Sequence, residues 1–282
     1  MSRAVWIGLL AGLALIAGLA WLFYGGDDDD SASGPVTIVD YTDSEAESAD
    51  EEGDGRRAPP RYPLLEEPSE SESEAVESKP LPELEASDES VREEASALSG
   101  AEPLESLLLP ERLIERFVVT FNSLDGSMAP LSKWPMRHAE GVPEVARVDE
   151  GRFRWKPANH RRYDAYVRVF TTPDASTLVD LYIRYYPLLQ EAYAALGEEE
   201  DYFNDRVIAI IDHLLEAPPA RESYALRQPR VLFTFLDPEL ERLSPGQKIL
   251  LRIGPEHSEA VRAQLRAIRA EIVARTGADD GP

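Results

Sequence analysis

The chain has 282 residues and a formal net charge of −24, with 53 acidic side chains against 29 basic ones. This balance excludes the class of nucleic-acid-binding domains that carry a basic surface for phosphates. No cysteine occurs, which excludes disulfides, thiol nucleophiles and cysteine-based zinc sites.

The first predicted element is a transmembrane helix over residues 4–24, a run without a charged side chain. About 20 apolar residues suffice to cross a bilayer as a helix. The alternative is a cleaved signal peptide, which has a shorter apolar run and small residues at its cleavage site. This chain instead places bulky residues there, which suit the membrane–water interface: Trp21, Phe23 and Tyr24. We therefore expect an uncleaved anchor.

The orientation of this anchor follows from the charges at its two ends. Arg3 precedes the run and four aspartates, 27–30, follow it. Basic residues favour the cytoplasmic side of a membrane. We expect residues 1–3 to form a cytoplasmic stub, residues 4–24 to contact the lipid bilayer of a bacterial inner membrane, and the remainder to lie in the periplasm.

Residues 25–86 are predicted to form a disordered acidic linker. Residues 25–83 hold 19 acidic side chains against 4 basic ones, and Ser, Glu and Pro dominate. So few apolar residues cannot offset the entropy lost on ordering. Residues 35–41 form a short β-prone island, either an isolated patch or a strand for a partner.

Residues 87–276 are predicted to form one mainly α-helical domain with a minor β-hairpin, followed by a flexible tail at 277–282. The helical signals are capping residues, prolines at starts, and apolar residues at 3–4 residue spacing. Expected helices begin at Ser87 or Asp88, Pro110, Asn159, Thr172, Asn204 and Ser244, and a last helix buries Val261, Leu265, Ile268 and Ile272.

Two segments depart from this helical pattern. Residues 145–148 and 152–155 flank Asp149-Glu150-Gly151, which predicts a hairpin with a glycine-containing turn. Residues 231–235 are ambiguous between strand and buried helix. Helix is favoured there, because Asp237-Pro238 starts a new element.

No nucleotide-binding, esterase or metalloprotease motif occurs, so no catalytic residue, cofactor or metal is assigned. Asp205, Asp212 and Glu216 share one helix face, and His213 with His160 and Asp164 is a conceivable metal or acid–base site. The alternative is that Asp212 caps or forms ion pairs and His213 lies at the surface.

Two groups of arginines are candidates for binding anions. Arg161 and Arg162 stand beside Tyr163 and could grip a carboxylate. The second group is a predicted basic face on the last two helices, which is either an ordinary solvated surface or a place where the acidic linker folds back: Arg252, Arg262, Arg266 and Arg269.

The stretch from about Leu81 to Glu271 resembles a bacterial envelope family known as domain of unknown function 3014. The resemblance lies in Leu109–Thr120, Asn159–Asp164, Leu181-Tyr182, Tyr186–Leu188, Tyr202–Arg206, Ile211–Leu215, Gln228–Leu232, Asp237–Glu241 and Gly246–Gly254. Family members are similar in having an anchor before an acidic linker. The turn at Glu198–Glu200 is more acidic than is usual in the family. The resemblance implies location and architecture and supplies no catalytic residues.

The polar residues of these motifs form either a shared functional site or buried bonds that hold helices in register: Asn159, Arg162, Tyr163, Asp164, Asn204, Asp205, Arg206, Asp212, Gln247 and Lys248. The leading hypothesis is a non-enzymatic interaction or scaffolding module with an envelope protein partner. The alternatives are a cell-wall or glycan-acting hydrolase and a small-anion sensor.

Overall fold

The computed structural model describes residues 59–64, 80–99, 104, 106–127, 131–139, 141–198, 201–229 and 232–276. The predicted anchor, the island at 35–41 and the tail lie outside these residues. Across the described part of the chain, no helix combines the length and the apolar character that crossing a bilayer requires.

The described residues form a mainly helical structure with a small antiparallel sheet. The elements in chain order are η2 (Leu84–Ala86), α2 (Asp88–Ser99), α4 (Leu113–Asn122), η3 (Leu131–Lys133), β1 (Val145–Asp149), β2 (Arg152–Trp155), η4 (Pro157–Tyr163), α5 (Asp164–Thr171), α6 (Ala175–Ala194), α7 (Phe203–Leu215), β3 (Ala225–Arg227), β4 (Thr234–Phe235), α8 (Pro238–Glu241), α9 (Pro245–Arg252) and α10 (Pro255–Thr276).

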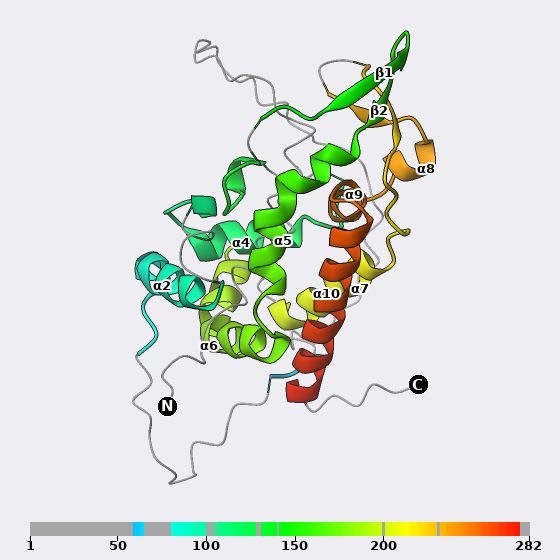
Figure 1. Ribbon diagram of the computed structural model, residues 1–282. Coiled ribbons are helices and arrows are strands. Elements are labelled where there is room, and N and C mark those ends of the chain that lie inside the picture. Colours follow the sequence, from blue (N-terminus) through cyan, green and yellow to red (C-terminus); the bar gives the residue numbers. More distant parts are fainter. Residues whose placement is uncertain are drawn as a thin grey trace, which may run out of the picture.

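The helices pack around α10 and α6. Helix α10 contacts α5, α6, α7 and α9, while α4 contacts α6 and α7. Figure 1 shows α10, in red, running alongside α5. The predicted inward residues of α10 are all buried, which confirms the periodicity seen in the sequence: Val261, Leu265, Ile268 and Ile272.

The sheet has the strand order β1-β2-β3-β4 and every pair is antiparallel. The predicted hairpin is therefore confirmed, but it continues into two further strands. Thr234–Phe235 is strand β4 and pairs with β3, so the helix expected at 231–235 is wrong. One face of the sheet covers a second, smaller apolar cluster that includes Trp155, Leu226 and Phe235.

Several helix starts differ from the expected ones. Helix α4 begins at Leu113, and its first amides are capped by a residue from another helix: the Asp88 carboxylate of α2 accepts from Arg112 N at 2.7 Å and from Leu113 N at 2.8 Å. Asn159 lies inside the 3₁₀ helix η4, and Asn204 lies inside α7, so neither is the cap it was expected to be. Helix α9 does begin at the predicted Ser244, which caps it in a capping box with Gln247.

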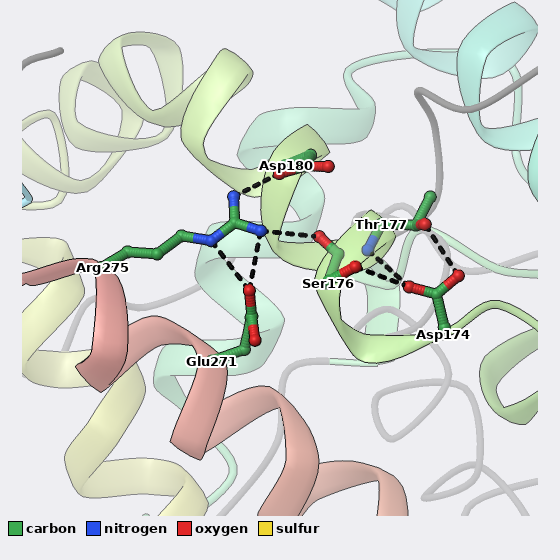
Figure 2. Close-up of polar contacts among 6 residues, drawn as sticks. All are labelled: Asp174, Ser176, Thr177, Asp180, Glu271 and Arg275. Carbon is green, nitrogen blue, oxygen red and sulfur yellow. Dashed lines mark hydrogen bonds and ion pairs between the residues drawn. The ribbon is translucent and has the colours of Figure 1, made fainter.

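Helix α10 is fastened to the start of α6 by an arginine network (Figure 2). Arg275 forms ion pairs with Glu271 of its own helix and with Asp180 of α6, and it also donates to the Ser176 carbonyl oxygen. The Asp174 carboxylate caps α6 by accepting from Thr177 N at 2.9 Å. The bonds of Arg275 hold the end of α10 against the start of α6.

Candidate functional site

The predicted polar residues at the start of α7 bind a segment of the chain that was expected to be disordered. We call residues 59–64 the strap. The two carboxylate oxygens of Asp205 accept from Arg61 N and from Tyr62 N, each at 2.8 Å. The Tyr62 side chain is buried at 8% exposure. The predicted linker of residues 25–86 thus includes a short stretch that packs against the folded domain.

Asn204 completes this contact from inside the protein. Its side chain is buried, donates to the Tyr62 carbonyl oxygen at 2.8 Å and accepts from the Tyr182 hydroxyl at 2.9 Å. Burial raises the pKa of Tyr182 well above its ordinary value, so this hydroxyl remains a donor. Asn204 and Asp205 together hold three backbone groups of the strap, which are two N–H donors and one carbonyl acceptor.

Arg206 faces the other way and ties α7 to the end of α4. It donates to the Asn122 side chain at 2.5 Å, to the Asn122 carbonyl oxygen at 2.8 Å, and with both terminal nitrogens to the Asp125 carboxylate at 2.7 Å. A paired, fork-to-fork arginine–carboxylate contact of this kind fixes relative orientation as well as distance. Three successive residues, 204–206, thus bind two different parts of the protein.

Asn159 and Arg162 hold the chain that enters the hairpin. Asn159 is fully buried, accepts from Glu144 N at 2.8 Å and donates to the carbonyl oxygens of Glu144 and Lys156. Arg162 donates to the carbonyl oxygens of Ala139 at 3.3 Å and Gly141 at 2.5 Å. Both side chains therefore satisfy backbone groups of an irregular segment, as buried polar groups normally do.

A histidine pair lies where η4 and α5 meet the turn before α10. His257 Nε2 lies 3.2 Å from the Asp164 carboxylate, and His160 Nδ1 lies 3.9 Å from that of Glu222. The His160 ring packs directly against Gly254, which has a φ of +90°. Tyr163, the last residue of η4, is buried, its hydroxyl has no hydrogen-bond partner among the described residues, and burial raises its pKa.

The remaining predicted residues form contacts among α7, α8, α9 and α10. Asp212 binds the Arg269 guanidinium at 2.6 and 3.2 Å. Gln247 donates to the His213 carbonyl oxygen at 2.9 Å, and the His213 ring lies 2.9 Å from the Ser244 hydroxyl. Lys248 pairs with Glu241 at 2.9 Å. Each of these contacts joins two elements of the domain.

The predicted basic face of Arg252, Arg262, Arg266 and Arg269 is not one surface. Arg252 and Arg262 are buried at 6% and 7% exposure. Arg262 donates to the carbonyl oxygens of Leu215, Ala217 and Pro218, and burial lowers its pKa. Arg266 pairs with Glu259 and Arg269 with Asp212. The helical spacing was right, but half of these arginines point inward.

Taken together, the predicted polar residues lie in several separate contacts rather than around one open cavity. In the described ranges, no group of three or more His, Asp or Glu side chains is arranged to hold a metal ion. Sequence reasoning missed Arg61, Tyr62 and Asp125 as partners of these residues. No local signal marks them, because each partner is at least 81 residues away along the chain.

The folded part of the chain matches a known protein family. The family described as protein of unknown function (DUF3014) matches residues 113–269, more than half of the chain. The chain belongs to this family. No curated protein and no solved structure matches it. The DUF3014 match includes α4 to α10 up to Arg269, and so contains Asp205 and Asn204 but not the strap that they hold.

Replacing Asp205 with asparagine is expected to loosen the strap. An amide NH₂ group, which cannot accept, replaces one of the two acceptor oxygens, so one strap N–H loses its partner at a cost of about 1.5 kcal/mol, or about tenfold in the opening equilibrium. Tryptic cleavage of the Arg61–Tyr62 bond should accelerate by this factor. The Arg57–Ala58 bond is the internal control, and equal acceleration at both bonds would contradict the prediction.

Acid is expected to destabilise the domain through His160. Burial lowers the pKa of His160 below 6.5, with Glu222 opposing this shift and His257 adding to it. The unfolded chain then binds more protons than the folded one as the pH falls below about 6.5, so stability decreases from pH 7 to pH 5. Burial shifts the pKa of His138 in the same direction. Urea unfolding at both pH values should show a smaller decrease for His160→Gln than for the native chain; an unchanged decrease would refute the assignment.

Proposed function

We propose that this chain is a membrane-anchored, non-enzymatic interaction or scaffolding module of the bacterial cell envelope. The uncharged run at residues 4–24 supports the anchor, and the acidic composition of residues 25–58 supports a spacer between membrane and domain. The proposed orientation places the amino terminus in the cytoplasm and the domain in the periplasm, with an envelope protein as partner.

The observation that carries this proposal is the docking of the strap on Asn204 and Asp205. These two motif residues bind the backbone of residues 61–62 with three hydrogen bonds of 2.8 Å. Two polar residues inside the region that matches the family thus connect the domain to its own linker. Such a contact is expected if the interaction function of the domain depends on how the linker attaches it to the membrane.

The residues of the two alternative functions are engaged in other bonds. A hydrolase would use Asp205 or Asp212 with His213, but Asp205 binds the strap, Asp212 binds Arg269, and the His213 ring contacts Ser244. An anion sensor would use Arg161 and Arg162, and of these Arg162 donates to two backbone carbonyl oxygens. These contacts favour structural roles for the same side chains.

The topology is tested with single cysteines, because the native chain has none. We expect a membrane-impermeant maleimide to label Ser33→Cys in spheroplasts, and to label Ser2→Cys only after the membrane is permeabilised. The opposite pattern would overturn the proposed orientation. Release of the labelled domain from the membrane in a shortened form would overturn the uncleaved anchor.

The scaffolding role is tested by photo-crosslinking the full chain in intact cells. We expect an envelope protein to be captured reproducibly through one face of the domain. A matched control is the same domain exported without residues 4–24, which should capture that protein less efficiently. Recovery of no specific partner, or hydrolysis of wall fragments by the purified chain that Asp212→Asn abolishes, would contradict the proposal.

A further inference from the structure

The chain contains three Asp-Gly pairs, at residues 54–55, 125–126 and 280–281. Aspartate rearranges readily before glycine, because glycine has no Cβ to obstruct attack on the neighbouring side chain. The glycine nitrogen attacks the aspartate Cγ, and the carboxyl OH leaves as water together with the amide proton, so that a five-membered imide forms. Water then opens this imide at the former main-chain carbonyl, and the chain afterwards runs through the aspartate side chain. One water is lost and one is regained, so the rearrangement needs no oxidant or reductant.

Of these pairs, Asp125-Gly126 lies within the described ranges, in the turn that follows α4. Arg206 of α7 binds both carboxylate oxygens of Asp125, each at 2.7 Å. The Gly126 N–H has to lose its proton before its nitrogen can attack, but it donates to the Ser123 carbonyl oxygen at 3.1 Å. Both reacting groups are therefore bound to other partners in the folded chain.

The charge of Asp125 also opposes the rearrangement. Burial acts to raise the pKa of this carboxyl group, but the hydrogen bonds and the charge of Arg206 act in the opposite direction. Together with the Asp125 backbone N–H and the charge of His213, they hold the pKa below its ordinary value. A carboxylate resists nucleophilic attack, because its negative charge repels the incoming electron pair. At neutral pH the Asp125 side chain is therefore in its unreactive form.

We propose that Asp125-Gly126 is a latent isomerisation site and that Arg206 suppresses the reaction by binding the Asp125 carboxylate. The paired contact with Arg206 has to open before the imide can form. In the rearranged product the main chain is one carbon longer and the free carboxylate stands on a shorter arm, so the two 2.7 Å bonds are lost. The modification thus detaches the end of α4 from the first turn of α7, where Asn204 and Asp205 hold the strap.

The experiment measures imide turnover in the full chain, purified in mild detergent and incubated at pH 7 in water labelled with heavy oxygen. Each opening of the imide places one labelled oxygen atom in the aspartyl peptide, which peptide mass spectrometry quantifies. The internal references are residues 54–55 in the predicted linker and residues 280–281 in the predicted tail. Bonds to a charged group must break before Asp125 reacts, so its labelling should be about tenfold or more slower in the native chain than in urea. The two references should change little between these conditions, and an equal change at all three sites would overturn the proposal.

Arginine variants separate the effect of Arg206 from that of folding in general. Arg206→Met keeps much of the apolar stem but cannot donate, so labelling at Asp125 should accelerate about tenfold. Arg206→Lys keeps the charge without the paired donors and should give an intermediate rate; it decides the question if the methionine variant does not fold. The matched control is Arg184→Met, which breaks the similarly half-buried pair with Glu94 and should leave the rate unchanged. An unchanged rate in both Arg206 variants, or equal acceleration by Arg184→Met, would overturn the proposal.

Discussion

Replacing Gly254 with alanine is expected to destabilise the domain by roughly 2–5 kcal/mol. Gly254 has a φ of +90°, a conformation that costs an alanine about 1–2 kcal/mol. A Cβ at this position would also lie 2.5 Å from Cγ and Nδ1 of His160. The imidazole cannot swing away cheaply, because its side chain is only 15% exposed and lies against the turn before α10. Urea-induced unfolding followed by circular dichroism measures the loss.

Gly197→Ala is the matched control for this substitution. Gly197 has a similar φ of +96°, but nothing lies within 4 Å of the added Cβ. It should therefore show only the backbone cost, about 1–2 kcal/mol. The difference between the two variants measures the clash with His160. Equal losses in the two variants would show that the His160 ring is not a rigid neighbour.

Replacing Arg262 with methionine is expected to cost about 2–4 kcal/mol, because three carbonyl oxygens at the end of α7 lose a charged donor. Arg262 binds the carbonyls of Leu215, Ala217 and Pro218 at 3.0, 2.5 and 3.0 Å. Methionine keeps most of the apolar stem but can donate no hydrogen bond. The free energy of unfolding at pH 7 measures the effect.

Arg266→Met, one turn further along α10, provides the comparison. Its side chain is 53% exposed and pairs with the 69% exposed Glu259. Exposed pairs of this kind contribute little, so the change should stay within about 0.5 kcal/mol. A loss at Arg266 as large as that at Arg262 would mean that the buried bonds are not the cause.

Local signals in the sequence predicted those elements whose ends are determined by neighbouring residues. The Ser244–Gln247 capping box fixed the start of α9, and the Asp149-Glu150-Gly151 turn fixed the hairpin. Strand β4 has only two residues and exists through its pairing with β3. A short apolar run such as residues 231–235 carries no periodicity that separates strand from helix. The prediction therefore failed where pairing between distant segments determines the structure.

The polar contacts were harder to predict than the helices for a related reason. Each residue of the predicted set is polar and can be picked out in the sequence, but the partners of several of them lie far away along the chain. Arg206 pairs with Asp125, and Asp205 binds Tyr62 across 143 positions. The prediction of a basic face was wrong because helical spacing shows only that the arginines are near one another. It does not show which of them, such as Arg262, point inward and cap a neighbouring helix.

The strap determines the point at which tension in the linker is applied to the folded domain. With the proposed anchor at residues 4–24, the leash between bilayer and domain consists of residues 25–58 while the strap is docked, and of residues 25–79 once it is released. For a flexible chain these lengths correspond to average spans of about 30–35 Å and about 37–45 Å. A load on the leash is borne first by the bonds of Asp205 and Asn204, before it reaches α2. Under load, the bonds between the strap and the start of α7 would therefore break first. Release of the strap would increase the average distance between the domain and the membrane.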